Sequence, residues 1–216
     1  MRIIDLSQEK TIINQFVTEL RDVDIQKDRL RFHTNILRIA HAMAYEISRT
    51  LDYEDKAVMT FFGVAHHKCP SDELVLATIL RAGIPFHRGF LDIFDNADNA
   101  FISAYRKYAP DGSFEVHTEY LASPRLDGKT VIIVDPMLAT GLSLEFALKS
   151  LLTKGTPRRI IVAAVIAARP AFEHLKTFLP EDTDVYCAAV DEELNEHFYI
   201  VPGLGDAGDL LYGEKE

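Results

Sequence analysis

The chain has 216 residues, of which 48% are hydrophobic and 26% charged, and its formal net charge is -10. These values are typical of a globular protein with one large domain or two small ones, and the negative charge disfavours a nucleic-acid binder that relies on overall positive potential. The N-terminal residues lack a basic and then apolar signal pattern, and the longest apolar run, Ile160–Ala168, is far shorter than the roughly 20 residues that span a bilayer. We therefore expect a cytoplasmic protein that binds neither membrane nor nucleic acid.

The predicted elements begin with helices and continue with short strands. Apolar residues recur at helical spacing over residues 12–20 and, in a longer second segment, over residues 30–47. Four short apolar runs follow, at residues 74–80, 131–134, 159–168 and 184–190. Helix-like stretches, including residues 143–154 and 171–178, alternate with these runs. Strands that are apolar on both faces and alternate with helices indicate a mainly parallel sheet covered on both sides, which is an α/β architecture.

A polar segment between residues 102 and 130 interrupts this pattern. Its Pro-Asp-Gly sequence at residues 110–112 is a turn signal between two stretches of mixed alternation. We predict that this segment forms a projecting hairpin or flexible arm.

The stretch Val131–Ser143, VIIVDPMLATGLS, places a lone carboxylate at the end of an apolar strand and a loop of small residues after it. In an open parallel sheet, ligands bind beyond the carboxyl ends of the strands, where Asp135 is expected. The loop Ala139–Ser143 leads into a predicted helix, so its free N–H groups and the positive end of the helix dipole favour an anion, above all a phosphate. The carboxylate of Asp135 is better suited to the hydroxyl groups of an attached ribose, or to Mg²⁺.

Each of these residues also has an ordinary structural interpretation. Thr140 or Ser143 could cap the helix, and Asp135 before Pro136 could form a turn. Two nucleotide-binding motifs do not fit, because no Gly-Lys-Ser/Thr follows as in a Walker loop and the glycine spacing of the dinucleotide fingerprint is missing. The additional acidic pair and lysine of a signalling receiver are not evident either.

The stretch Val131–Ser143 resembles the phosphoribosyl-diphosphate loop of type I phosphoribosyltransferases, and its Asp-Pro-Met-Leu-Ala-Thr-Gly form is similar to the uracil phosphoribosyltransferase branch. Two further segments agree in family order: ILRAG at residues 79–83, and YIVPGLGDAGDLLYG at 199–213, which is nearly the C-terminal signature of the family. The likeness extends from about Asp22 to the C-terminus. It implies a single type I phosphoribosyltransferase-like α/β domain over residues 1–216. Its parts are N-terminal helices (1–55), a flexible β-arm (102–130) and a base-binding hood segment (191–216).

The resemblance also implies the reaction, in which uracil and 5-phosphoribosyl 1-diphosphate give UMP and diphosphate, a step of pyrimidine salvage. Catalytic roles fall on four residues: Arg81, Arg106, Asp135 and Asp206. Arg81, Arg106 and Asp206 are expected to contact the ribosyl diphosphate together with the whole loop, namely Asp135, Pro136, Met137, Leu138, Ala139, Thr140, Gly141, Leu142 and Ser143. Uracil is expected to bind to Tyr199, Ile200, Gly205, Asp206 and Ala207.

The cofactor and partners follow from the same resemblance. Mg²⁺ is expected to arrive on the diphosphate substrate rather than at a metal site of the protein. A homodimer or higher homo-oligomer is expected, and some family members are activated by a purine nucleotide such as GTP. Lys107 and Tyr120 are weaker candidates for contacts with the diphosphate. Without the resemblance, PGLGDAGD would be a glycine-rich turn in which Asp206 or Asp209 caps a short helix.

One position departs from the family pattern, because Leu142 stands where the family commonly has a second glycine. If Leu142 has helical backbone angles, its side chain costs little. If a positive φ is required there, the affinity for phosphate suffers.

Other residues and functions fit the sequence less well than this interpretation. His66, His67 and Cys69 have no fourth ligand nearby, and Cys187 has no paired spacing with Cys69, so we predict a solvated loop rather than a metal site. A regulator of the same fold that senses pyrimidine nucleotides and binds RNA is an alternative, although it needs a clustered basic surface. An enzyme of the same fold that uses another base is a further alternative.

Overall fold

The computed structural model describes residues 1–108 and 114–214, with the backbone alone for residues 104–119. Its central sheet has the strand order β1-β10-β9-β7-β4-β5-β6, with β8 paired to β9. The strands of this sheet are β1 (Arg2–Asp5), β4 (Leu74–Ile79), β5 (Asp98–Tyr108), β6 (Phe114–Ala122), β7 (Thr130–Val134), β8 (Met137–Leu138), β9 (Arg159–Ala168) and β10 (Asp184–Asp191). All neighbours pair in parallel except β5 and β6. The predicted parallel α/β architecture is confirmed.

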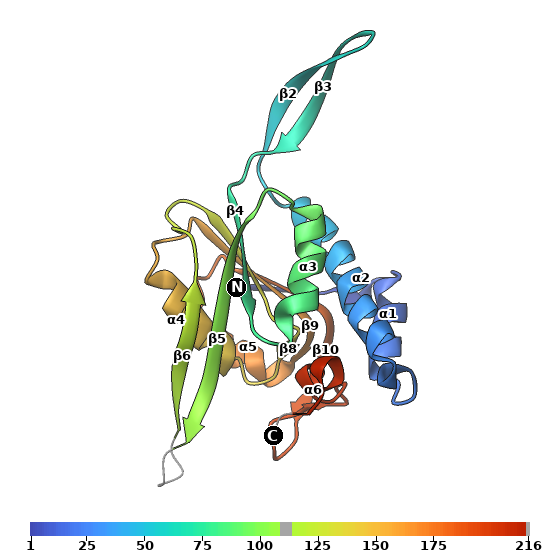
Figure 1. Cartoon of the computed structure of the whole chain (residues 1–216), viewed down its shortest axis with the longest axis vertical. Helices are drawn as coiled ribbons and strands as arrows, with labels where there is room; N and C mark the ends of the chain where they lie inside the picture. Colours follow the sequence, from blue (N-terminus) through green and yellow to red (C-terminus); the bar gives the residue numbers. More distant parts are fainter. Residues whose placement is uncertain (109–113, 215–216) are drawn as a thin grey trace.

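Helices cover both faces of the sheet (Figure 1). One face carries α1 (Ile13–Arg21), α2 (Arg29–Ser48) and α3 (Gly83–Ile93), and the other carries α4 (Leu142–Leu152) and α5 (Arg169–Leu175). Strand β7 shows why its residues are apolar throughout: Ile132 and Val134 belong to the first core, and Val131 and Ile133 belong to the second. Short 3₁₀ turns at Leu6–Gln8 and Ile25–Lys27 flank α1.

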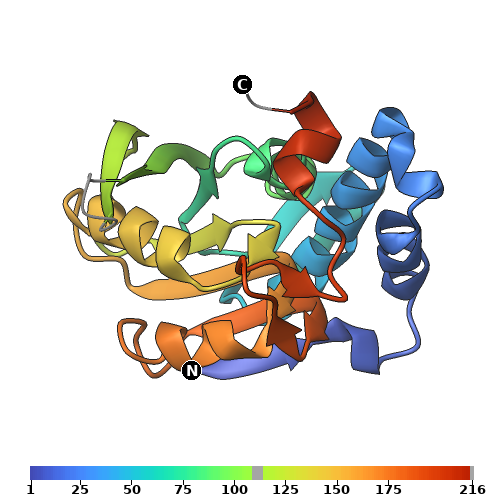
Figure 2. The same ribbon diagram turned by 90° about the horizontal axis from the view of Figure 1, so that it is seen from below.

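The last segment folds over the carboxyl edge of the sheet. It contains a small antiparallel pair, β11 (Glu193–Leu194) and β12 (Ile200–Val201), and then α6 (Ala207–Tyr212). Figure 2 shows α6 and the end of the described chain standing above the sheet, away from the N-terminal strand. The segment falls within the predicted hood of 191–216, and we use the name hood for the residues from Glu192 to Glu214.

The predicted hairpin is present as β5 and β6, which pair antiparallel with a register shift between Ser103 and Ala104. The first half of β5 also pairs with β4, so the hairpin extends the main sheet rather than beginning beyond it. The Pro-Asp-Gly turn at 110–112 lies outside the described residues.

A second hairpin was not predicted. Residues Tyr53–Thr60 (β2) and Gly63–Pro70 (β3) form an antiparallel pair that projects from the end of the molecule opposite α6 (Figure 1). The prediction of a loop around His66 and His67 is therefore wrong, because both residues lie in β3, although their side chains are exposed as expected. Nearly every residue of this hairpin faces solvent, so its sequence lacks the apolar alternation that marks a strand. Within the described part of the chain, no group of three His, Cys, Asp or Glu residues is placed to hold a metal ion.

The direction in which strands are added reverses between β4 and β7. From β4 the chain adds β5 on one side, and from β7 it adds β9 and then β10 on the other side. In open parallel sheets this switch point leaves a crevice beyond the carboxyl ends of the two strands, where ligands bind. The carboxyl ends here are Ile79 and Val134, followed directly by the ILRAG segment and by Asp135. Among the described helices, none has the length and apolar character of a membrane span.

Candidate active site

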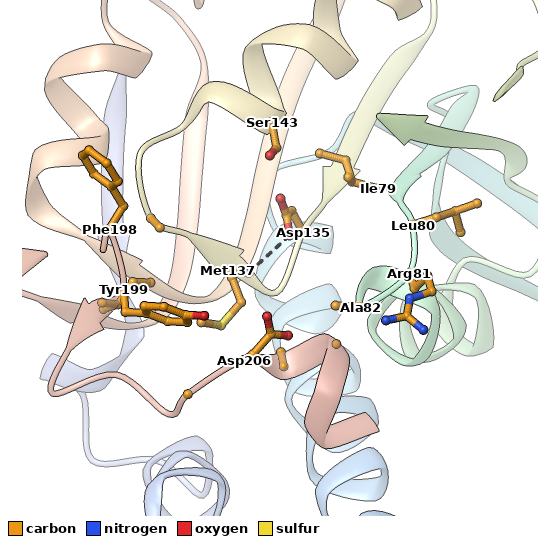
Figure 3. A pocket seen from close by; sticks show the side chains of 15 residues that line it. Ile79, Leu80, Arg81, Ala82, Asp135, Met137, Ser143, Phe198, Tyr199 and Asp206 are labelled. Atoms are coloured by element: carbon orange, nitrogen blue, oxygen red, sulfur yellow. Dashed lines mark hydrogen bonds between the residues drawn. The ribbon is translucent and has the colours of Figure 1, made fainter. Parts of the chain in front are cut away.

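A cavity of about 280 Å³ lies at this switch point (Figure 3). Three segments that are distant in sequence line it: the turn after β4, the loop after β7, and the hood. The predicted site residues that line the cavity are Arg81, Asp135, Met137, Ala139, Ser143, Tyr199, Ile200, Gly205, Asp206 and Ala207. The structure therefore brings together the three motifs on which the family resemblance is based.

A smaller cavity of about 70 Å³ adjoins the first one and is formed by the loop after β7 and the first turn of α4. Its lining consists of Asp135, Met137, Leu138, Ala139, Thr140, Gly141, Ser143 and Leu144. We call this cavity the loop cup. Pro136 and Leu142 line neither cavity in the described structure.

The first half of the loop is fixed to β9. Asp135 donates its N–H to the carbonyl of Ala163 at 3.1 Å, and the carbonyl of Pro136 accepts from Val165 and Ile166. Met137 and Leu138 then pair with β9 as the short strand β8. The side chain of Leu138 is buried in the core, so this residue can offer only its main chain to a ligand.

The second half of the loop turns into α4 at Gly141. This glycine has φ +80°, a left-handed angle that residues with a Cβ rarely adopt. Leu142 is the first residue of α4, and no positive φ occurs there. The departure from the family pattern therefore falls on a helical position, where leucine is tolerated.

The start of α4 is left open toward the loop cup. Gly141 provides no side-chain cap, and the hydroxyl of Thr140 accepts from the N–H of Leu142 at only 3.4 Å. The N–H groups of Ser143 and Leu144 have no acceptor among the described residues. Unpaired N–H groups at a helix N-terminus, together with the helix dipole, form an anion site. The structure thus gives Thr140 only a weak capping role.

Asp135 is the buried acidic group of the cavity. It is 9% exposed, and Figure 3 shows its side chain between Ser143 and Asp206. Burial raises the pKa of Asp135 to about 7, although the N–H of Met137, at 3.3 Å, acts in the opposite direction. A carboxyl group with one long hydrogen bond retains most of its capacity to accept bonds from a ligand. The predicted turn role of Asp135 is also present, because its side chain accepts from the residue two positions later.

Arg81 lies in the turn between β4 and α3, at the opposite side of the cavity from Tyr199 (Figure 3). Its peptide bond with Leu80 is cis. Its guanidinium is 3.9 Å from the carboxylate of Asp209 and 5.8 Å from the ring centroid of Tyr212, both in α6. An ion pair of this length leaves the N–H donors of Arg81 free for phosphate oxygens. Neither Asp209 nor Tyr212 was predicted at the site, although both belong to the C-terminal signature.

The hood combines a helix cap with a cavity wall. Asp206 accepts from the N–H of Asp209 at 3.0 Å and so caps α6, which confirms the structural alternative for this residue. The same side chain lines the cavity, and its second oxygen stays available. Gly205 has φ +92°, so its conformation rather than crowding requires glycine. Tyr199 and Phe198 are about half exposed at the cavity mouth, and Phe198 was not predicted.

Some predicted contacts are not described by the structure. The side chains of Arg106 and Lys107 lie outside the described residues, and their contact with the diphosphate stays a prediction. Tyr120 on β6 is 54% exposed and does not line the cavity. Ile79, Leu80, Ala82 and Gly208 line it without having been singled out, although ILRAG and PGLGDAGD contain them.

Comparisons with known proteins identify the family of the chain. The family model described as "Uracil phosphoribosyltransferase" matches residues 7–214. The chain is 53% identical over 215 residues to a uracil phosphoribosyltransferase of Porphyromonas gingivalis, with all of both chains covered. It is 37% identical over 210 residues to one of Pyrococcus furiosus, which covers 96% of this chain and 88% of the relative.

Solved structures show the same fold. The AQ2163 protein of Aquifex aeolicus superposes with a TM-score of 0.85 at 32% identity, over 98% of each chain. A hypoxanthine phosphoribosyltransferase of Staphylococcus aureus superposes with a TM-score of 0.51 at 14% identity, over 75% of this chain and 76% of that one, which shows the fold alone. The sequence motifs, the cavity at the switch point and these relatives lead to one conclusion: the chain is a phosphoribosyltransferase and belongs to the uracil phosphoribosyltransferase family.

Proposed function

We propose that this enzyme transfers the 5-phosphoribosyl group from 5-phosphoribosyl 1-diphosphate to uracil, giving UMP and diphosphate. The observation that carries the proposal is the meeting of the loop cup, Asp135, Arg81 and the hood around one cavity. Each part suits a different portion of the two substrates. The name shared by the relatives supports uracil as the base.

The loop cup suits the 5′-phosphate of the sugar. The open N–H groups of Ser143 and Leu144 and the positive end of α4 provide donors without a side-chain cation. Asp135, which adjoins the cup, is placed to accept hydrogen bonds from the ribose hydroxyl groups. These contacts hold the sugar so that its anomeric carbon faces the wider cavity.

Arg81 suits the diphosphate. Negative charge grows on this group as its bond to the anomeric carbon lengthens, so a guanidinium stabilises the transition state more than the ground state. When bound, Mg²⁺ would add charge neutralisation on the same diphosphate. The carboxylates of Asp135 and Asp206 line the cavity and would be within reach of such an ion.

The hood suits the base. Uracil presents a carbonyl, an N–H and a second carbonyl along one edge, and main-chain groups of Ile200 and of residues 205–207 can pair with that sequence of acceptors and donors. Cytosine reverses part of this pattern, so it would leave polar groups of the hood unpaired. No side chain has to act as a covalent nucleophile, because a ring nitrogen of uracil attacks the anomeric carbon directly. This reaction returns a free pyrimidine to the nucleotide pool, which is pyrimidine salvage.

The test is a direct assay. The purified protein is incubated with labelled uracil, 5-phosphoribosyl 1-diphosphate and Mg²⁺, in parallel with cytosine, hypoxanthine and orotate, and with a chelator in one arm. We expect UMP from uracil, at least about 100-fold slower nucleotide formation from the other bases, and loss of activity with the chelator. A faster reaction with another base would reassign the substrate, and no nucleotide from any base would refute the proposal.

A further inference from the structure

Each end of β10 carries a buried aspartate that is paired with arginine: Asp191 with Arg21, and Asp184 with both Arg2 and Arg159. Asp184 opens the strand and Asp191 ends it, and both are less than 10% exposed, at 5% and 6%. Because β10 is parallel to β7, Asp191 lies at the carboxyl edge of the sheet, where the cavity is, and Asp184 lies at the opposite edge. The two ends therefore allow a comparison within one strand.

Arg21, the last residue of α1, grips Asp191 with two hydrogen bonds. Its Nη2 donates to Oδ1 at 2.8 Å and its Nη1 donates to Oδ2 at 2.9 Å. Arg21 and Asp191 also bind Gly203 of the hood, through both the carbonyl and the N–H of its main chain. The N–H of Gly203 donates to Asp191 Oδ2 at 3.1 Å, and its carbonyl accepts from Arg21 Nη1 at 3.1 Å. We call these three residues the hood clamp.

Gly203 lies between the two parts of the hood that line the cavity, Ile200 and Gly205. It has φ +60°, and a Cβ at this position would be 2.1 Å from the carbonyl oxygen of Ile200. The turn at Gly203 therefore packs directly against Ile200, and fixing one fixes the other. Neither Arg21 nor Asp191 lines the cavity, so both act through the main chain of the hood.

We infer that Arg21 and Asp191 are positioning residues for the base subsite. They hold the Ile200–Ala207 segment in the position that binding of uracil requires. This inference rests on the proposed function. Charge-assisted, bidentate hydrogen bonds in a buried setting are directional, and loss of one partner leaves the other charge buried and unpaired. Without the clamp, the hood is no longer held in a fixed position relative to the sheet.

The opposite end of β10 supplies a comparison, in which Asp184 is also held by Arg2, through Nε to Oδ1 at 2.8 Å and Nη2 to Oδ2 at 3.0 Å. Arg159 donates to Asp184 at 2.8 Å and to the carbonyl of Thr50 at 2.7 Å, as Arg21 does to Asp191 and Gly203. The side chains are equally exposed, at 23% and 8% for this pair and 22% and 7% for the clamp. The difference that bears on the base subsite is the segment that each arginine holds, because Thr50 does not line the cavity.

The experiment compares Arg21→Met with Arg159→Met in the full chain. We expect both variants to lose thermal stability, and Arg159→Met to lose less, because Arg2 still pairs with Asp184. Only Arg21→Met should raise the KM for uracil by about tenfold or more, since misplaced main-chain partners cost about as much as a lost buried hydrogen bond. The KM for 5-phosphoribosyl 1-diphosphate should stay within about threefold in both variants, because the loop cup does not contact the clamp. Arg21→Lys, which keeps the charge without the fork, should give an intermediate KM for uracil.

Calorimetric titration with UMP provides a readout that does not depend on turnover, and Arg21→Lys serves if Arg21→Met does not fold. An active Arg21 variant with an unchanged KM for uracil would overturn the inference while leaving the proposed function in place. An equal rise of both KM values, or an equal effect of Arg159→Met, would reduce the clamp to general stability and overturn it as well. A wild-type protein that makes no UMP would refute the proposed function, and the inference would fall with it.

Discussion

Asp135 is the cavity residue whose ionisation the fold strongly alters. Burial raises its pKa from the ordinary value of 3.8 to about 7. Between these values the folded protein keeps a proton that the unfolded chain has lost, so unfolding releases a proton and stability falls as pH rises. The ligand-free enzyme thus carries a stability cost at neutral pH, which hydrogen bonds from ribose hydroxyl groups would offset.

Asp135→Asn removes this titration. Relative to the wild type, the free energy of unfolding of the variant should rise by about 4 kcal/mol between about pH 4 and pH 7.5, as the pKa shift requires. Urea unfolding of the ligand-free proteins at several pH values measures the difference.

Asp184→Asn is a control in which the fold lowers the pKa of the aspartate instead of raising it. Burial acts to raise the pKa of Asp184, but hydrogen bonds from Arg2 and Arg159 outweigh it and hold that pKa below the ordinary value. Its contribution is complete above the ordinary value of 3.8 and is lost only below it, so this variant should be destabilised by a constant amount across the same window. Parallel curves for Asp135→Asn and the wild type would contradict the burial of an uncompensated carboxyl group.

Leu142 tests the departure from the family pattern. Since it is the first residue of α4 and lines neither cavity, Leu142→Gly should change the KM for 5-phosphoribosyl 1-diphosphate by less than about tenfold, which is roughly 1.4 kcal/mol. Steady-state kinetics measures this directly. A much larger gain in affinity would mean that the leucine impairs the loop.

At the scale of elements, the loop cup depends on how α4 and α5 meet. Gly141 adopts φ +80°, and a Cβ there would lie 3.1 Å from Leu175 Cδ2 and 3.3 Å from His174 Cδ2, both in α5. Gly141→Ala should therefore cost about 1–2 kcal/mol in stability from the left-handed backbone. It should also raise the KM for 5-phosphoribosyl 1-diphosphate by more than about tenfold, because relief of the contact moves the cup.

Gly128 provides the matched substitution. It has φ +74°, and nothing lies within 4 Å of its Cβ position. Gly128→Ala should show a similar loss in chemical denaturation and an unchanged KM. If Gly141→Ala left the KM unchanged too, the precise shape of the cup would not matter for phosphate binding.

The elements that the sequence revealed are those buried on both faces. Strands β7, β9 and β10 read as continuous apolar runs because the two cores cover them. Strands β2 and β3 were not predicted, because both of their faces are exposed and their sequence has no apolar alternation. Strand β1 and helix α3 were not predicted either. Strand β1 is short and pairs only at the sheet edge, and α3 follows the ILRAG turn without a side-chain cap that would mark its start.

The parts of the site that could be predicted are those that belong to sequence motifs. The carboxylate at the end of β7 and the small-residue loop could be interpreted from local physics, whereas the roles of Arg81 and the hood came from resemblance. The hood clamp could not be predicted, because Arg21 and Asp191 are 170 residues apart and neither belongs to a motif. Long-range ion pairs of this kind become visible only when the topology is known.

At the scale of the whole molecule, the β2–β3 hairpin exposes large apolar side chains to solvent. Phe61 and Phe62 at its tip are 96% and 99% exposed, and Met59 is 80% exposed. Apolar side chains gathered on a projection mark an interaction surface, and the family resemblance implies self-association. We expect that Phe61→Ser combined with Phe62→Ser shifts the protein toward smaller species in sedimentation velocity, whereas Leu30→Ser, at a position 76% exposed on α2, does not. An unchanged distribution would show that the hairpin is not a surface for self-association.

The proposed function requires that one cavity holds a phosphate at α4 and a pyrimidine at the hood. The most direct test is a crystal structure of the enzyme with UMP, which carries both groups. We predict that the phosphate accepts hydrogen bonds from the N–H groups of Ser143 and Leu144, the ribose hydroxyls contact Asp135, and the uracil ring pairs with the main chain of residues 200–207. A phosphate outside the loop cup, or a base bound away from the hood, would contradict the account.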